Sequence, residues 1–135
     1  MIMPEKKPLK VLAVDDDDLV LSVMVQSLEE LGFDTISALG GRSALALLDS
    51  GEPIDLLVTD VRMPRVSGMD VASAVRQKSQ SLPILFVTGF SAQFVDSNRN
   101  PDPHVALLRK PYTLAALKNT VSALMSGPRS APALA

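Results

Sequence analysis

The sequence predicts a doubly wound α/β domain, in which a five-stranded parallel sheet carries helices on both faces. Three observations support this fold class. Short apolar runs alternate along the chain with segments of helical periodicity, which is the pattern of right-handed β–α–β crossovers. The runs are continuously apolar rather than alternating, as in strands that are covered on both faces. The length of 135 residues suits one domain with an adequate core.

Five apolar runs are the predicted strands. They are short, rich in Val, Leu and Ile, and bounded by polar or turn-forming residues. Their ranges are 10–14, 33–38, 54–59, 84–87 and 105–108. The first, third and fourth runs end at Asp15, Asp60 and Thr88, and Lys110 follows the last one closely.

Two helices are predicted in the first half of the chain. Residues 18–32 carry apolar side chains every three or four positions, with Asp18 as a suitable N-cap and Gly32 as a suitable end. Residues 41–49 are rich in Ala and Leu and predict a short helix. Each helix lies between two strands, as the fold requires.

The second half of the chain predicts two clear helices and one weak one. Ser67 caps the first of them, and the last helix covers about 113–125 with one apolar face. Residues 91–104 contain few apolar side chains and several Asn, Pro and Asp residues. We therefore expect only a short or mobile helix in that segment, followed by a loop.

The sequence is organised as one domain with two flanking segments. We expect the domain to cover residues 9–126. Residues 1–8 are predicted to be an N-terminal extension. Residues 127–135 are rich in Pro and Ala, and we expect them to form a disordered tail.

Composition excludes several classes of function. Without cysteine, the chain has no disulfide, thiolate metal site or cysteine nucleophile. A net charge of −2 gives no basic surface for nucleic acid, and no apolar run approaches the roughly 20 residues of a membrane span. The first ten residues lack the apolar stretch of a signal peptide, so we expect a cytoplasmic protein without membrane or nucleic-acid partners.

The polar residues that end the strands predict a binding site. In an open parallel sheet, ligands bind outside the carboxyl ends of the strands, so residues 15–18, Asp60, Thr88 and Lys110 should gather there. Clustered carboxylates repel one another unless a cation is present, and hard oxygen ligands suit Mg²⁺ or Mn²⁺. A carboxylate can accept a phosphoryl group when nearby positive charge neutralises the phosphoryl oxygens.

Four segments resemble a known family: VLAVDDDD (11–18), LLVTDVRMPRVSG (56–68), ILFVTG (84–89) and LLRKPY (107–112). Their order, spacing and strand-end positions are similar to those of the response-regulator receiver domain of two-component signalling, the group of the chemotaxis receiver. The resemblance covers about residues 8–126. It implies a flavodoxin-like sheet with the strand order 2-1-3-4-5.

The resemblance implies a role for each residue of the site. Asp60 is the expected phosphoacceptor. For the Mg²⁺ ion, it implies direct ligation by Asp16, a mainly water-mediated role for Asp15, and the backbone carbonyl of Arg62 as a further ligand.

Thr88 and Lys110 are expected to contact the phosphoryl oxygens, and the Lys110–Pro111 bond is expected to be cis. Many receivers carry an aromatic residue three positions before the lysine, where this chain has Leu107. The form of the conformational switch is therefore left open.

The function implied is that of a signalling phosphoacceptor. A histidine kinase or a histidine phosphotransfer protein would donate the phosphoryl group. The chain would then signal by a conformational shift through contact with a downstream protein. It would catalyse only its own phosphorylation and dephosphorylation, and so is not expected to be a conventional enzyme.

Two alternatives remain open at the level of sequence. The pattern Asp16-x-Asp18-x-Val20 superficially fits an aspartyl-phosphate hydrolase of the haloacid-dehalogenase type, in which Asp16 would be phosphorylated instead of Asp60. The chain could also be a phosphate-independent interaction module on the same fold. The position of a covalent phosphate, or its absence, distinguishes the three.

Overall fold

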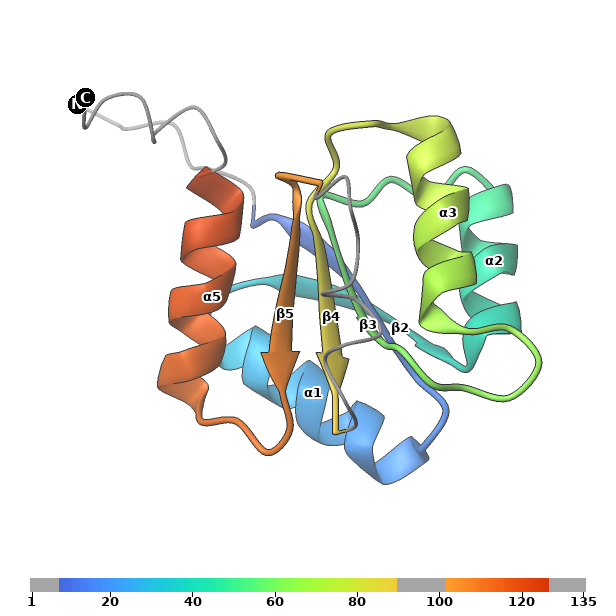
Figure 1. The fold of residues 1–135 in the computed structure, drawn as a ribbon. Helices are drawn as coiled ribbons and strands as arrows, with labels where there is room; N and C mark the ends of the chain where they lie inside the picture. Colours follow the sequence, from blue (N-terminus) through green and yellow to red (C-terminus); the bar gives the residue numbers. More distant parts are fainter. Residues whose placement is uncertain (1–7, 90–101, 127–135) are drawn as a thin grey trace.

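A single parallel sheet organises the molecule. The computed structural model describes residues 8–89 and 102–126, and the sheet within them has the strand order β2-β1-β3-β4-β5 (Figure 1). The strands are β1 (Lys10–Asp15), β2 (Asp34–Leu39), β3 (Leu56–Asp60), β4 (Ile84–Thr88) and β5 (Val105–Arg109). The helices are α1 (Asp18–Glu30), α2 (Gly41–Asp49), α3 (Gly68–Lys78) and α5 (Leu114–Ser126).

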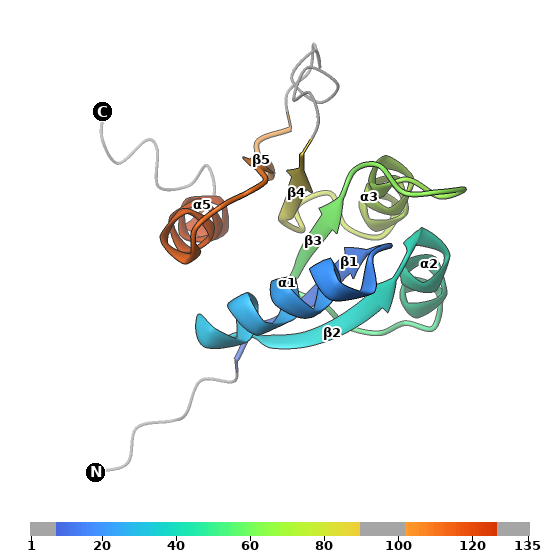
Figure 2. The same cartoon turned by 90° about the horizontal axis from the view of Figure 1, so that it is seen from below.

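Helices cover both faces of the sheet. Figures 1 and 2 show α1 and α5 on one side and α2 and α3 on the other. The core is accordingly divided into two hydrophobic clusters, one on each face. The predicted doubly wound fold and its strand order are confirmed.

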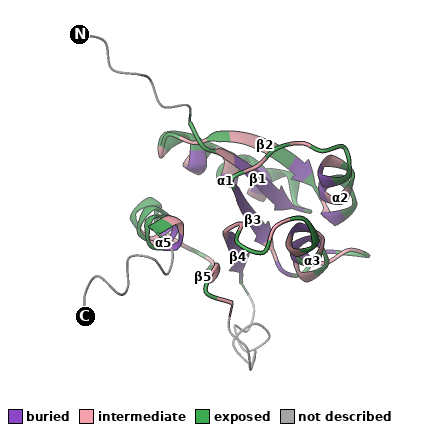
Figure 3. Cartoon of the chain, turned by 90° about the horizontal axis from the view of Figure 1, so that it is seen from above, coloured by how far each residue is buried: buried purple, intermediate pink, exposed green. Residues whose placement is uncertain are grey.

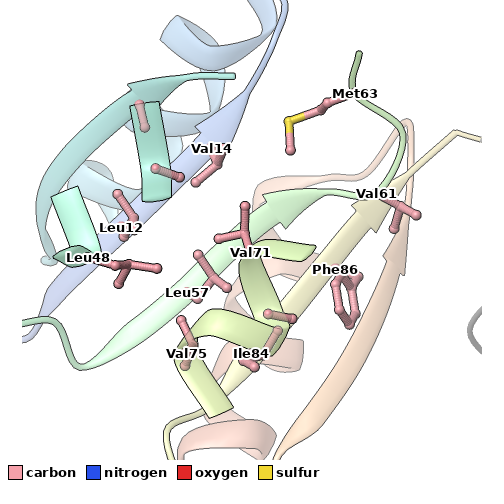
Figure 4. Packing of buried hydrophobic residues seen from close by; sticks show 13 residues of the cluster. Leu12, Val14, Leu48, Leu57, Val61, Met63, Val71, Val75, Ile84 and Phe86 are labelled. Atoms are coloured by element: carbon pink, nitrogen blue, oxygen red, sulfur yellow. The ribbon is translucent and has the colours of Figure 1, made fainter. Parts of the chain in front are cut away.

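The core is built from aliphatic side chains, as a composition with 4% aromatic residues predicts. In the cluster on the α2 and α3 side, Leu12 and Leu57 from the sheet meet Val71 and Val75 from α3 (Figure 4). The central strands β1, β3 and β4 are almost wholly buried, whereas the edge strands β2 and β5 are more exposed (Figure 3). This rigid centre fixes the positions of the strand ends.

Local signals set the helix ends, with one correction to the predicted caps. The side chain of Asp17, not Asp18, caps α1 by accepting hydrogen bonds from the backbone N–H groups of Leu19 and Val20. Asp18 instead occupies the first turn of the helix. Gly32 follows α1 with a φ of 98°, a conformation that favours glycine at a helix end.

Other predicted boundaries agree with the structure to within one or two residues. The predicted helix 41–49 matches α2, and Ser67 caps α3 in a capping box with Asp70. The predicted extension (1–8) and the weak helix predicted within 91–104 lie largely outside the described residues, and the tail (127–135) lies wholly outside them. Among the described helices, none combines the length and the apolar character that crossing a membrane requires.

The loop from β3 to α3 is packed tightly against the end of β3. The backbone N–H of Gly68 donates a hydrogen bond of 2.8 Å to the carbonyl of Val61. A Cβ atom on Gly68 would lie 2.0 Å from the carbonyl oxygen of Asp60, so only glycine fits here. The start of α3 is therefore fixed directly against the backbone of Asp60.

This packing predicts a large effect of Gly68→Ala. The new methyl group would meet backbone atoms that cannot rotate away, so we expect the free energy of unfolding to fall by about 3 kcal/mol. Gly89→Ala is the matched control, because its Cβ would meet only the Lys110 side chain at 3.9 Å. Its stability should stay within about 1 kcal/mol of wild type. Equal urea midpoints for both variants would contradict the expectation.

Candidate functional site

The carboxyl ends of the strands bring the predicted site residues to one edge of the sheet. Asp15, Asp60 and Thr88 are the last residues of β1, β3 and β4, and Lys110 follows β5. The arrowheads of β4 and β5 in Figure 1 mark this edge. Parallel pairing places Asp60 opposite Val87, and Thr88 is the next residue along the neighbouring strand.

Three carboxylates form the centre of the site. Asp15, Asp16 and Asp60 each offer an oxygen, and these oxygens lie within 4.8 Å of one another. Asp15 is buried, Asp60 is half-buried and Asp16 is exposed. One oxygen of Asp15 accepts a 2.9 Å hydrogen bond from the Asp17 N–H, and one of Asp60 accepts a 2.8 Å bond from the Val61 N–H.

Lys110 supplies positive charge to this group. Its Nζ lies 3.1 Å from Oδ2 of Asp15 and 3.8 Å from Oδ2 of Asp60. The backbone N–H of Lys110 donates a 2.9 Å hydrogen bond to the carbonyl of Thr88, which extends the β4–β5 ladder into the site. The Lys110–Pro111 bond is cis, as the family resemblance implies. The lysine thus joins the end of β5 to the ends of β1 and β3.

The pKa of Asp60 reflects the charges that surround it in the site. Burial raises the pKa of this carboxyl above its ordinary value, and the neighbouring negative charges of Asp15 and Asp16 raise it further. The positive charge of Lys110 and the hydrogen bond from the Val61 N–H lower the pKa but do not cancel these effects. The cluster therefore carries more negative charge than Lys110 alone relieves.

The donor set fits a hard divalent cation. An octahedral Mg²⁺ ion binds oxygen at about 2.1 Å, so opposite ligands lie roughly 4 Å apart. The three carboxylate oxygens lie within 4.8 Å of one another, so the group is compact enough to surround one such ion. The absence of His and Cys from the group favours Mg²⁺ or Mn²⁺ over softer metals.

The other residues predicted for the site differ in burial and in position relative to the three carboxylates. Thr88 is buried at the end of β4, and Arg62 is exposed two positions after Asp60. Asp17 and Asp18 lie outside the carboxylate group, at the cap and first turn of α1. The D-x-D pattern of the hydrolase alternative is therefore not brought together as a pair of site carboxylates.

Tyr112 is a site neighbour that the sequence did not single out. It is half-buried against the cluster on the α1 and α5 side. Burial, followed by the negative charge of Asp15, raises the pKa of its hydroxyl. Its position two residues after Lys110 was the available signal. It is the single tyrosine of a chain without tryptophan, so its fluorescence reports on this site.

Comparison with known proteins agrees with this geometry. Residues 11–122 match the family described as response regulator receiver domain. The response regulator receiver protein CpdR of Brucella abortus (strain 2308) is 29% identical over 116 residues, which are 86% of this chain and 96% of CpdR. The sensor kinase CckA of the same organism is also 29% identical over 116 residues, covering 85% of this chain and 12% of CckA.

A solved structure shows the same similarity in three dimensions. The crystal structure of a response regulator receiver protein from Sinorhizobium medicae WSM419 has a TM-score of 0.81 and 32% sequence identity. The similarity covers 89% of this chain and 96% of that protein. By contrast, the chain spans only about a third of the length of some transcriptional regulators that it matches.

The raised pKa of Asp60 predicts a pH-dependent stability effect. The folded protein binds a proton at this carboxyl more tightly than the unfolded chain does, so ionised Asp60 destabilises the fold at neutral pH. Without Mg²⁺, Asp60→Asn should therefore raise the free energy of unfolding at pH 7. The gain should disappear as the pH falls below the ordinary value of 3.8, because the carboxyl is then protonated in both states.

Urea unfolding at a series of pH values checks this expectation. Glu52→Gln is a suitable control, because it removes a negative charge from the loop after α2, outside the carboxylate cluster. A gain for Asp60→Asn that is equal at pH 7 and in strong acid would contradict the account, as would an equal gain for the control.

Proposed function

The chain belongs to the response-regulator receiver domain family, and on that premise we propose that it accepts a phosphoryl group on Asp60 as a switch of two-component signalling. The supporting observation is the convergence of Asp15, Asp16, Asp60 and Lys110 at one edge of the sheet. This arrangement provides a nucleophilic carboxylate, ligands for a cation and a neighbouring positive charge. Those are the components that phosphoryl transfer to a carboxylate requires.

The proposed donor is a phosphohistidine of a histidine kinase or a histidine phosphotransfer protein. A carboxylate oxygen of Asp60 attacks the phosphorus, a P–O bond forms, and the P–N bond to the imidazole breaks. The bonding electrons return to the imidazole nitrogen of the donor, which can then take up a proton. Lys110, 3.8 Å from Asp60, stabilises the negative charge on the phosphoryl oxygens, and the buried Thr88 hydroxyl supplies a hydrogen bond.

Asp15, Asp16, Asp60 and the backbone carbonyl of Arg62 are the proposed ligands of Mg²⁺, with Mn²⁺ as a substitute. When bound, the ion neutralises charge on the carboxylates and on the phosphoryl oxygens. Asp15 accepts hydrogen bonds from Lys110 and from the Asp17 N–H, which orient its side chain in this group. The ligand group is thus already assembled around Asp60.

The output is proposed to be a population shift that a downstream protein detects by contact. Leu107 of β5 is half-buried and packs against the cluster on the α2 and α3 side. It lacks the aromatic ring that many receivers carry at this position. We therefore propose a switch by aliphatic repacking of β5, in a cytoplasmic protein that catalyses only its own phosphorylation and dephosphorylation.

The first test is covalent labelling by a small phosphodonor. Incubation with acetyl phosphate and Mg²⁺ should add the mass of one phosphoryl group to the intact protein, and Asp60→Asn should prevent it. Lys110→Met should slow labelling by at least about tenfold, because a positive charge is lost from the transition state. Chelation of Mg²⁺ should abolish it. A wild-type protein that stays unlabelled would favour the phosphate-independent module.

The surface beside the site suggests where a phosphohistidine donor docks. Leu19 and Val23 of α1 are 75% and 53% exposed and lie one helical turn apart on the same face. The helix begins two residues after Asp16, so a protein bound there would hold its phosphohistidine close to Asp60. Apolar side chains that are exposed together near a site favour a protein partner over a small ligand.

The double variant Leu19→Ser/Val23→Ser tests this surface. Phosphotransfer from a panel of phosphorylated histidine kinases and phosphotransfer proteins should slow by at least about tenfold, because apolar interface contacts are lost. Leu9→Ser is the control, since Leu9 is also exposed (41%) but precedes β1 at the opposite edge of the sheet. Equal slowing by both variants, or by neither, would argue against docking on α1.

A further inference from the structure

One guanidinium group joins the starts of two neighbouring strands, β4 and β5. It lies at the amino ends of the strands, away from the site at their carboxyl ends. Arg76 lies in the last turn of α3. Its Nε donates a 2.7 Å hydrogen bond to Oδ2 of Asp102, and its Nη1 donates one of 2.7 Å to the carbonyl of Leu82. Longer contacts reach the carbonyls of Ser79 at 3.3 Å and His104 at 3.5 Å. Arg76 therefore bridges the loop before β4 and the turn before β5.

Asp102 organises the turn that leads into β5. Its carboxylate accepts a 2.8 Å hydrogen bond from the His104 N–H, and its carbonyl accepts one of 3.1 Å from the Val105 N–H. The carbonyl of His104 then accepts a 2.8 Å bond from the Ile84 N–H of β4. The first cross-strand bond between β4 and β5 is thus built on the turn that Arg76 holds.

Strand β5 needs such an anchor more than the other strands that carry site residues. Among the described strands it pairs only with β4, whereas β1, β3 and β4 each pair on both sides. Its residues are half-buried or exposed, whereas those of β4 are all buried. Strand register is weakly specified where burial is incomplete, and a shift of one residue moves the chain by about 3.3 Å and reverses its side chains.

The register of β5 sets the position of Lys110. The lysine follows the strand directly, and its Nζ lies 3.1 Å from Asp15 and 3.8 Å from Asp60. A slip of one residue would remove both contacts. Asp15 and Asp60 do not depend on β5, because they end strands that lie in the centre of the sheet.

Helix α3 runs from the phosphoacceptor Asp60 to the turn before β5. Gly68 at its start packs on the backbone of Asp60, and Arg76 in its last turn holds Asp102. The helix spans about 16 Å, which its 11 residues give at 1.5 Å each. The acceptor and its lysine are therefore linked both across the site and through α3, Arg76 and β5.

We propose that Arg76 is a positioning residue for phosphoryl transfer, which acts by fixing β5 on β4 and so placing Lys110 against Asp60. The inference rests on the proposed function of Asp60. An arginine suits this role because its planar fork reaches several acceptors at once, which a lysine cannot do. The ion pair is mostly shielded, with side-chain exposures of 21% for Arg76 and 26% for Asp102.

The pKa of Asp102 agrees with its hydrogen-bonded contact to Arg76. Burial alone would raise the pKa of this carboxyl. The hydrogen bond from Arg76, the bond from the His104 N–H and the charge of Arg76 outweigh burial, and the pKa lies below its ordinary value. The ionised, hydrogen-bonded form of the turn is therefore the favoured one at neutral pH.

The test compares Arg76→Met with wild type in three measurements on the full chain. The rate of labelling by acetyl phosphate at saturating Mg²⁺ should fall by at least about tenfold, because Lys110 is displaced. Mg²⁺ affinity, followed by Tyr112 fluorescence, should not fall, because the carboxylate ligands lie on β1, on β3 and in the loop after β1, and a displaced Lys110 competes less with the ion. Faster amide hydrogen exchange should appear at residues 104–110 and at Ile84, whose N–H bonds the His104 carbonyl, and not in β1 or β3.

Two further variants make the outcome decisive. Asp102→Asn keeps the size of the side chain and should produce the same pattern with a smaller change in rate, even where Arg76→Met folds poorly. Lys10→Met removes a cation that lies 3.5 Å from Asp34 at the same edge of the sheet, and it should leave the labelling rate unchanged. Its strand, β1, is paired on both sides.

Each result then decides the proposal. A slower rate without loss of Mg²⁺ affinity supports positioning through β5. An unchanged rate in both Arg76→Met and Asp102→Asn overturns it, as does a parallel loss of rate and Mg²⁺ affinity, which would indicate general loss of structure. If wild type itself is not labelled, the proposed function fails first, and the role of Arg76 falls with it.

Discussion

Repulsion among three carboxylates at one edge of the sheet is the constraint on which the rest of the site depends. Oxygens of Asp15, Asp16 and Asp60 lie within 4.8 Å of one another at the ends of β1 and β3, and the burial of Asp15 and partial burial of Asp60 strengthen the repulsion between those two. Lys110 relieves part of it through contacts of 3.1 and 3.8 Å. The remaining negative charge creates the demand for a cation, and a phosphoryl group adds further charge that the same positive groups must balance.

The fold serves this constraint by making the strand ends rigid. The central strands are buried on both faces, so their last residues cannot retreat from one another as freely as loop residues could. The close packing of Gly68 against Asp60 removes further freedom from the acceptor. Lys110 is the exception, because it follows an edge strand that is held at its other end by Arg76 and Asp102. The site thus combines a fixed group of acidic residues with a more adjustable positive charge.

Most of the fold and the acidic centre could be predicted from the sequence, because continuous apolar runs mark buried strands and the residue after each run marks its end. The cap of α1 was misassigned by one position, since four consecutive aspartates offer the same chemistry and only the backbone conformation selects Asp17. The contact between Arg76 and Asp102 could not be predicted, because it joins residues 26 positions apart with no periodic pattern. Tyr112 was missed for a similar reason, since its coupling to Asp15 appears only in three dimensions.

The position of the covalent phosphate tests the central claim most directly. Borohydride reduces an acyl phosphate of aspartate to homoserine, so reduction of the labelled protein and peptide sequencing identify the modified residue. The account predicts homoserine at position 60 and at no other aspartate. Homoserine at position 16 would indicate the hydrolase chemistry instead. Stable labelling at any residue other than Asp60 would contradict the assignment of Asp15 and Asp16 as ligands around a single acceptor.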